Sequence, residues 1–406
     1  MRILLSTYGS RGDVEPLAAL AVALKALGAE AVVSTPPDAD LIALLGRAGV
    51  EHAPAFMSVR DWIDAARREP KTLPELSAIM IPAQYDALDA VAAGCDAIVS
   101  TGLFPSTAAA QCVAERRGLP HLSGVFCPLS LPSEHHWPFP RPGRPLPPEV
   151  TDARALWALN AETMDELFGE AYNAQRIVVG LAPVSNVRDH VFGDRPLLAS
   201  DPILWPWEPT DMSDPVQTGA WILRDDRPLS EDLRAFLNAG TPPVYIGFGS
   251  INLPSAKAAA VTAIEAVRAQ GRRVVLAAGW ADNGLIDDGG DCLLVGEVNQ
   301  QALFGRVAAA IHHGGAGTTT TAARAGATQV IVPQIVDQPF WAARIEGLGV
   351  GVAHEGATPT FETLSAALEI ALAPETQVRA TAVADTIPTD GATAAAKLLL
   401  ERIGRR

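Results

Sequence analysis

A glycine-rich turn near the start of the chain holds the first residues that could perform chemistry. The apolar run Ile3–Ser6 is predicted to be a strand, and the turn Gly9–Asp13 follows it. Ligands of open α/β sheets bind beyond the carboxyl ends of the strands. Asp13 is therefore a candidate general base, although its position also suits a helix N-cap. The turn lacks the GxGxxG spacing of dinucleotide-binding folds, so NAD binding is not predicted.

A second glycine-rich turn, with the sequence HHGGAGTTT, begins at residue 312 and also follows a predicted strand. Glycines and small hydroxyl residues at a helix N-terminus favour anion binding. An imidazole beside them adds a hydrogen-bond donor suited to a pyrophosphate. The turn lacks the GKS/T of a P-loop, so an NTPase is not predicted. The candidate phosphate ligands here are His312, His313, Gly315, Gly317 and Thr318.

Two more strand ends carry polar side chains. Asp337 and Gln338 lie in the segment VDQPFW, where they could share hydrogen bonds with vicinal hydroxyls. The same residues suit a helix start, with Asp337 as N-cap and Pro339 in the first turn. Ser250 ends the segment IGFGS after another predicted strand. Because all four turns end strands, we expect them to converge on one cleft between two lobes.

The elements that must position these residues alternate between strands and helices, which predicts parallel sheets of the α/β class. The fold class predicted is therefore two doubly wound, Rossmann-like lobes. In the N-terminal half we expect strands at Ile3–Ser6, Ala31–Ser34 and Ala97–Ser100, and helices at Glu15–Gly28, Ala39–Ala48 and Pro105–Gly118. In the C-terminal half we expect strands at Val244–Phe248, Arg273–Ala277, Cys292–Val295, Ala308–His312 and Gln329–Val332.

The domain boundaries follow from composition. The segment LWPWEPTDMSDPVQT, residues 204–218, interrupts both periodicities and is predicted to be a linker. We therefore expect an N-terminal lobe at 1–203 and a C-terminal lobe at 219–390. The final segment, 391–406, is predicted to be a helix that returns to the N-terminal lobe.

Composition and charge exclude several protein classes. The 406 residues carry 31 Lys and Arg against 46 Asp and Glu, a net charge of −15. This acidity argues against nucleic-acid and anionic-membrane partners. Four cysteines without CxxC spacing predict neither a disulfide scaffold nor a zinc site. No apolar run approaches the ~20 residues that span a bilayer, and the first strand is too short for a signal peptide, so we expect a cytoplasmic protein.

A proline-rich segment interrupts the N-terminal half. Between residues 127 and 150 it carries eight prolines, with Trp137 and Phe139 among them. Prolines exclude a regular helix or central strand here. Two interpretations stay open: an ordered loop whose aromatic side chains line a binding cleft, and a surface excursion packed by its own rings.

Taken together, these segments resemble a known enzyme family along essentially the whole chain. The matching segments include LLSTYGSRGDVEPLAALA, PPVYIGFGS, HHGGAGTTTTAARAG and IVDQPFW. The chain resembles the two-lobed, GT-B-fold family 1 glycosyltransferases of bacteria. It is most similar to the enzymes that glycosylate vancomycin- and teicoplanin-type glycopeptides.

The resemblance implies a role for each matched residue. Asp13 would deprotonate the acceptor hydroxyl, and His312 would contact the donor diphosphate. Asp337 and Gln338 would bind sugar hydroxyls. Plant relatives carry a ribose-binding glutamate where this chain has Thr320. The donor-side set that the resemblance implies also includes Ser10 and Ser250 near the phosphates, Val298 at the base, and His313, Gly315, Gly317 and Thr318 in the same turn.

The function implied is inverting transfer of glucose, from UDP-glucose or a dTDP-sugar, to a hydroxyl of a glycopeptide aglycone in antibiotic biosynthesis. No metal or other cofactor is expected, and the expected partners are the donor and a small-molecule acceptor. Trp137 and Phe139 are the candidate acceptor residues. Three alternatives remain: a sterol or lipid glucosyltransferase, a nucleotide-sugar epimerase of the same fold, and a silent sugar-nucleotide-binding protein.

Overall fold

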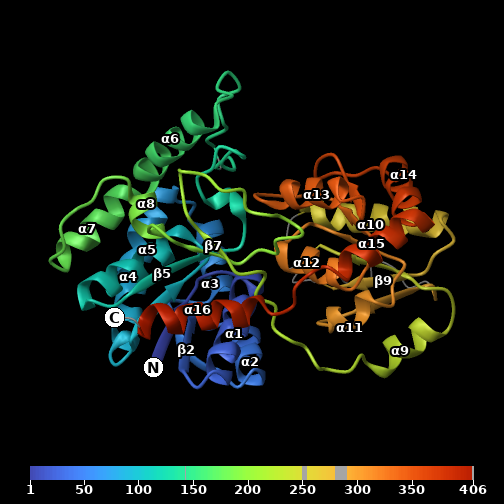
Figure 1. Cartoon of the computed structure of the whole chain (residues 1–406). Helices are drawn as coiled ribbons and strands as arrows, with labels where there is room; N and C mark the ends of the chain where they lie inside the picture. Colours follow the sequence, from blue (N-terminus) through green and yellow to red (C-terminus); the bar gives the residue numbers. More distant parts are fainter. Residues whose placement is uncertain (142, 249–253, 279–289, 405–406) are drawn as a thin grey trace. The chain divides into compact units, whose positions relative to one another are not determined.

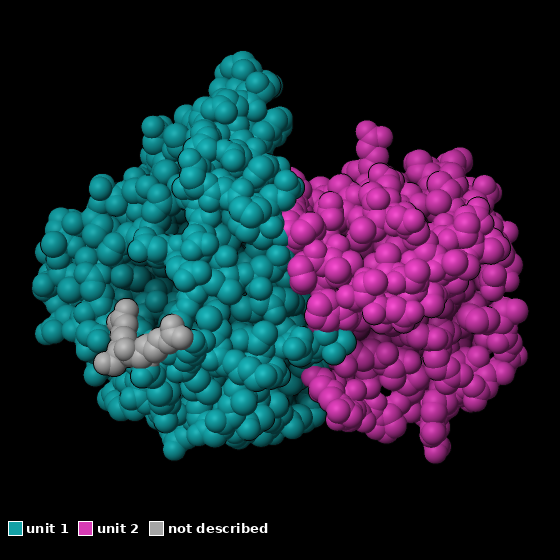
Figure 2. Space-filling view, in the orientation of Figure 1, with its two compact units in different colours: residues 1–200, 207–223, 389–406 teal, residues 201–206, 224–388 magenta. Residues whose placement is uncertain are grey.

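The computed structural model of the chain describes residues 1–404 except 142, 249–253 and 279–289 (Figure 1). The chain forms two compact units, coloured separately in Figure 2. Unit 1 comprises residues 1–200, 207–223 and 389–406, and unit 2 comprises 201–206 and 224–388. The segment 204–218 is thus shared between the two units.

Unit 1 contains a parallel sheet of seven strands in the order β3-β2-β1-β4-β5-β6-β7. Because each parallel strand needs a crossover, helices cover both faces of the sheet. The strands are β1 (Arg2–Ser6), β2 (Glu30–Thr35), β3 (Glu51–Pro54), β4 (Ala97–Ser100), β5 (His121–Val125), β6 (Leu197–Leu198) and β7 (Val216–Gln217).

The helices of unit 1 form a core on each side of this sheet. On one side α1 packs against the last helix of the chain, α16, through buried residues such as Leu20 and Leu399. On the other side α4, α5 and α7 pack together. The helices are α1 (Arg11–Ala26), α2 (Ala39–Arg47), α3 (Val59–Arg68), α4 (Leu73–Ala92), α5 (Phe104–Arg117), α6 (Ala153–Met164), α7 (Glu170–Val178), α8 (Val187–Phe192) and α16 (Gly391–Gly404), with a 3₁₀ turn at Pro128–Ser130 and a π-helical turn at Asp165–Gly169.

Unit 2 repeats the plan with a parallel sheet of six strands in the order β10-β9-β8-β11-β12-β13. Its strands are β8 (Val244–Gly247), β9 (Val274–Ala277), β10 (Cys292–Val295), β11 (Ala309–His312), β12 (Gln329–Ile331) and β13 (Gly351–Ala353). Its helices are α9 (Glu231–Asn238), α10 (Pro254–Ala269), α11 (Gln300–Phe304), α12 (Ala316–Arg324), α13 (Gln338–Gly347), α14 (Phe361–Ala371) and α15 (Pro374–Ala384).

The predicted α/β class is confirmed, and two local expectations are corrected. Helix α1 begins at Arg11 rather than Glu15, so the second half of the glycine-rich turn is already its first turn. The N-cap is Ser10, and Asp13 occupies the third helical position rather than the cap. No described helix is long and apolar enough to cross a membrane.

The proline-rich segment is ordered by hydrogen bonds to backbone carbonyls. The Nε2 atom of His136 lies 3.1 Å from the oxygen of Pro128 and 3.0 Å from that of Leu131. The indole of Trp157, on α6, donates to the His136 carbonyl at 3.0 Å. Trp137 remains 47% exposed, so its ring does not pack the segment.

A buried ion pair joins the helices on one side of unit 1. The guanidinium of Arg176, on α7, makes two bonds of 2.7 and 2.8 Å to the carboxylate of Glu115 on α5. The Arg176 side chain is 2% exposed and that of Glu115 is 35% exposed. The hydrogen bonds from Arg176, above all, lower the pKa of Glu115 to about 2.

We expect Arg176→Gln to lower the unfolding free energy of unit 1 by about 3 kcal/mol at pH 7. This is the low end for breaking a buried pair, because solvent partly screens Glu115. Arg117→Gln is the matched control, since Arg117, at the end of α5, forms a more exposed pair with Asp89 of α4, and its loss should cost less than about 1 kcal/mol. Urea unfolding followed by circular dichroism measures both; equal losses would contradict the assignment.

The same pair predicts a pH dependence. The folded pKa of Glu115, about 2, lies below the ~4.3 of an unfolded glutamate. Its contribution to stability is therefore complete above about pH 4.3 and is lost as the pH falls towards 2. In Arg176→Gln the slope of unfolding free energy against pH should shrink in this window. An unchanged slope would assign the dependence to other carboxylates.

Candidate functional site

Asp13 lies at the carboxyl edge of the unit 1 sheet, in the first turn of α1. Its Oδ2 accepts a hydrogen bond from the backbone N–H of Ser10 at 2.8 Å, and the side chain is half-buried. Two glycines make room for it. A Cβ at Gly9 would lie 2.1 Å from Oδ2, and one at Gly102, whose φ is +88°, would lie 3.6 Å from Oδ1. The carboxylate is thus held in one orientation in a tightly fitted site.

A row of buried serines lies beneath Asp13, at the same level of three adjacent strands. Ser6 of β1 pairs in register with Ser34 of β2 and with Ser100 of β4. The Oγ atoms of Ser6 and Ser34 are buried without a hydrogen-bond partner among the described residues. The sequence carries a signal for this row, which our sequence analysis missed: the three strands end in the similar segments LLST, VVST and IVST.

Aromatic side chains lie beside the first turn. The ring of Tyr8 lies 5.8 Å from that of Phe56, which lies 5.4 Å from the ring of Trp62 on α3. Phe139, one of the two predicted acceptor residues, is half-buried beneath the guanidinium of Arg141 at 4.5 Å. Tyr8 is buried, whereas Phe56, Trp62 and Phe139 are half-buried and offer apolar surface to a flat, aromatic ligand.

In unit 2, His312 and His313 have opposite surroundings. His312 is fully buried; its Nδ1 accepts from the N–H of Gly314 at 3.1 Å, and its Nε2 lies 2.9 Å from Oε1 of Gln329. Burial lowers the pKa of His312 to about 3, so the ring is neutral. Both ring nitrogens of His312 are therefore engaged by groups of unit 2, and the contact with the donor diphosphate that the resemblance implies stays a prediction.

His313 lies at the turn that is predicted to bind an anion. Its side chain is half-buried, and its Nδ1 has no hydrogen-bond partner in the part of the chain that the structure describes. A Cβ at Gly315 would lie 2.7 Å from its Nε2, so only glycine allows the ring to sit here. Gly315 is the N-cap of α12, and exposed Gly317 and half-buried Thr318 follow in the first turn. The turn therefore presents helix N–H groups and one imidazole, whose pKa is lowered by burial although a hydrogen bond to the Gly247 backbone raises it.

Gly314 joins this turn to the Asp337–Gln338 segment. Its φ is +91°, and a Cβ would lie 2.6 Å from Ile331 and 3.2 Å from the carbonyl oxygen of Gln338. Neighbouring strands β11 and β12 end at the same edge, which explains the close approach. The two donor-side motifs therefore lie against each other.

Asp337 and Gln338 differ in which of their side-chain atoms are available to bind a ligand. Asp337 is half-buried, its Oδ2 accepts from the indole of Trp341 at 2.9 Å, and burial raises its pKa. Gln338 is buried, and its Oε1 accepts from the backbone of Gln334 and Ile335, which shapes the preceding loop. Only its amide nitrogen remains to meet a ligand.

The remaining predicted positions are less informative. Val298 is half-buried at the carboxyl end of edge strand β10, just before α11. Thr320, at the position of the plant ribose ligand, is 2% exposed. Ser250 lies outside the described residues. No group of His, Cys, Asp and Glu suited to a metal ion occurs in the described ranges.

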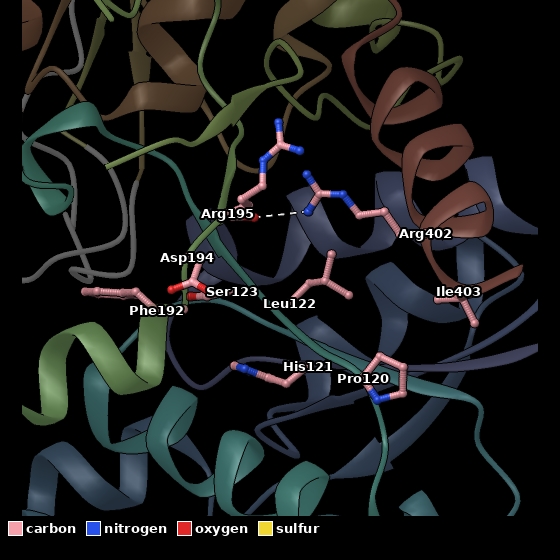
Figure 3. A pocket seen from close by; sticks show the side chains of 10 residues that line it. Pro120, His121, Leu122, Ser123, Phe192, Asp194, Arg195, Arg402 and Ile403 are labelled. Atoms are coloured by element: carbon pink, nitrogen blue, oxygen red, sulfur yellow. Dashed lines mark hydrogen bonds between the residues drawn. The ribbon is translucent and has the colours of Figure 1, made fainter. Parts of the chain in front are cut away.

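A pocket of about 350 Å³ in unit 1 is not this site (Figure 3). It is lined by Pro120–Ser123, by 192–195 and by Arg402 and Ile403, and Arg402 donates to the carbonyl of Arg195 at 3.0 Å. These residues begin β5, whereas Asp13 follows the carboxyl end of β1. The pocket thus lies at the opposite edge of the sheet.

The chain is similar to characterised proteins along its whole length. Residues 279–395 match the family described as erythromycin biosynthesis protein CIII-like, C-terminal domain. Glycosyltransferase GtfE of Amycolatopsis orientalis is 53% identical, and the vancomycin aglycone glucosyltransferase of that organism is 50% identical. Each alignment covers 100% of this chain and 98% of the relative.

Two further comparisons bear on the ligand and the fold. The dTDP-epi-vancosaminyltransferase of Amycolatopsis orientalis is 48% identical over 94% of this chain and 93% of its own length. The crystal structure of glycosyltransferase VinC in complex with dTDP has a TM-score of 0.70 at 20% identity, covering 100% of both chains. At this identity the structural likeness establishes the fold alone.

We expect His313→Ala to weaken pyrophosphate binding about tenfold or more, because a hydrogen bond to a charged group is lost. Isothermal titration calorimetry measures the change. His354→Ala is the matched control in the same unit, since that ring is used by Gly356 and Thr363. Unchanged pyrophosphate affinity in His313→Ala would leave anion binding to the helix N–H groups alone.

Proposed function

Because the chain belongs to the bacterial GT-B glycosyltransferase family that includes the vancomycin aglycone glucosyltransferase, we propose that it glucosylates a glycopeptide aglycone in antibiotic biosynthesis. The observation that carries the proposal is Asp13, a carboxylate fixed at the carboxyl edge of unit 1. The acceptor assignment is supported by the name of a relative that is 50% identical over the whole chain.

In this proposal unit 2 binds the donor. The N-terminus of α12, His313 and Thr318 bind the diphosphate, with Ser10 and Ser250 as further ligands. The carboxylate of Asp337 and the amide of Gln338 bind sugar hydroxyls, and the backbone near Val298 meets the base. UDP-glucose and dTDP-sugars remain alternative donors, because one relative is named a glucosyltransferase and another for a dTDP-sugar.

Asp13 acts as the general base of a single displacement. The acceptor oxygen attacks the anomeric carbon as the bond from that carbon to the diphosphate oxygen breaks, which inverts the configuration. The acceptor proton moves to Asp13, and the diphosphate leaves with the bonding electron pair. His313 and the N–H groups of α12 stabilise its developing charge.

The acidities of the two groups set the timing of the proton transfer. A phenol has a pKa of ~10 and an aspartate ~3.9, so complete transfer before attack would cost about 8 kcal/mol. The proton therefore moves late, as the new bond forms. An aliphatic hydroxyl, being less acidic, would require a still later transfer, so a phenol is the easier acceptor.

A mass-spectrometric transfer assay tests the proposal. UDP-glucose and dTDP-sugars are each offered with a glycopeptide aglycone, simple phenols and a sterol. Addition of a hexose to the aglycone is the expected result. Transfer to the sterol alone would make the chain a lipid glucosyltransferase. Conversion of the nucleotide sugar to an isomer without transfer would make it an epimerase.

We expect Asp13→Asn to lower kcat at least ~100-fold, a typical general-base contribution. The asparagine keeps an oxygen that can accept from Ser10 N–H, so α1 should remain intact. Donor affinity, measured by calorimetry, should stay unchanged. Glu15→Gln is the control on the same helix, because Glu15 pairs with Arg11. A kcat within a few fold of wild type for Asp13→Asn would remove the base assignment.

A further inference from the structure

The guanidinium of Arg141, in the proline-rich segment of unit 1, has no carboxylate partner among the described residues. Its Nη2 donates to the sulfur of Met164 at 3.2 Å, and its carbon lies 4.5 Å from the centroid of the Phe139 ring. Its Nε is buried and unpartnered. The side chain is half-buried, and burial lowers its pKa to about 10, so it remains charged at neutral pH.

Such an arrangement is costly, because a buried charge is normally paired. A thioether and a ring replace little of the hydration that a guanidinium loses. Other arginines of low exposure have either a carboxylate or backbone carbonyls as partners: Arg176 pairs with Glu115 and Arg188 with Asp189, whereas Arg273 donates to the carbonyls of Phe236 and Thr241. Even the near neighbour Arg144 pairs with Glu166 at 2.8 Å. Arg141 is therefore available to bind an anion, which no described residue supplies.

A chain of contacts connects Arg141 to Asp13 within unit 1. Gly102, which lies against Asp13, precedes α5. The ring of Phe104, in the first turn of α5, lies 4.9 Å from that of Phe168. Met164, which accepts from Arg141, lies one helical turn before Phe168.

We propose that Arg141 binds a carboxylate of the acceptor, remote from the hydroxyl that is glycosylated. The inference rests on the proposed function and narrows its substrate class to acceptors that carry a negative charge. A guanidinium suits this role because its planar donors match the two oxygens of a carboxylate. Phe139 beneath it and exposed Trp137 near it in sequence offer apolar surface to the ring system that carries the carboxylate.

The test compares one glycopeptide aglycone as its free acid and as its neutral amide. For wild type we expect kcat/KM to be about tenfold or more higher for the acid, through KM. In Arg141→Gln this preference should disappear, with the amide unaffected and kcat for either acceptor within twofold. Arg141→Lys should recover part of the preference. Arg144→Gln is the matched control and should keep it in full.

Three results would overturn the inference: no acid preference in wild type, equal losses for acid and amide in Arg141→Gln, or an acid preference that survives this substitution. The first needs no variant, so a folding defect cannot obscure it. If no acceptor is glycosylated, the proposed function fails instead. Calorimetry of acid and amide binding, without donor, then tests the role of Arg141. Tighter binding of the acid that is lost in Arg141→Gln supports the inference, and equal binding of acid and amide by wild type refutes it.

Discussion

The chemistry assigned to this chain depends on parallel strands that all end at one edge of their sheet. In unit 1 this constraint brings Asp13, after β1, against Gly102, after β4. In unit 2 it brings the turn after β11 against Gln338, after β12. Because the turns converge at this edge, their backbones come close together. The close contacts are made at glycines, which have no side chain. These turns therefore require glycine because a Cβ atom would not fit, as much as because of the backbone dihedral angles.

The sequence predicts the strands with continuous apolar runs, such as β1 and β8, but misses β3, β5 and β13, whose segments EHAP, HLSGV and GVA are short or interrupted by polar and small residues. Strands β6 and β7 have two residues each, too few for any periodicity to show. The surroundings of the two histidines could not be predicted for a different reason. Strand β11 is buried on both faces, so its pattern does not reveal which way His312 points. Only the hydrogen bonds of the folded strand separate an interior imidazole from its exposed-side neighbour.

Two other features can be seen in the sequence, but their significance depends on the folded structure. The repeated Ser-Thr endings of three strands become a buried row only once the register aligns Ser6 with Ser34 and Ser100. Arg141 looks like an ordinary loop arginine in the sequence. Its significance lies in the lack of a carboxylate near it among the described residues, and no local pattern can show which distant side chains fold beside a given position. The resemblance to a family implies roles for the matched residues, but it does not give the structural environment of each one.

The return of α16 to pack on α1 bears on how such enzymes can be recombined. Because unit 1 is built from three separate stretches of the chain, a single crossover near residue 224 would join the first two stretches to a foreign terminal helix. The buried interface of Leu20, Leu24, Leu399 and Ile403 would then mix side chains selected in different proteins. A chimera that exchanges unit 1 must therefore have two crossovers, so that residues 389–406 come from the same protein as the rest of the unit that they cover.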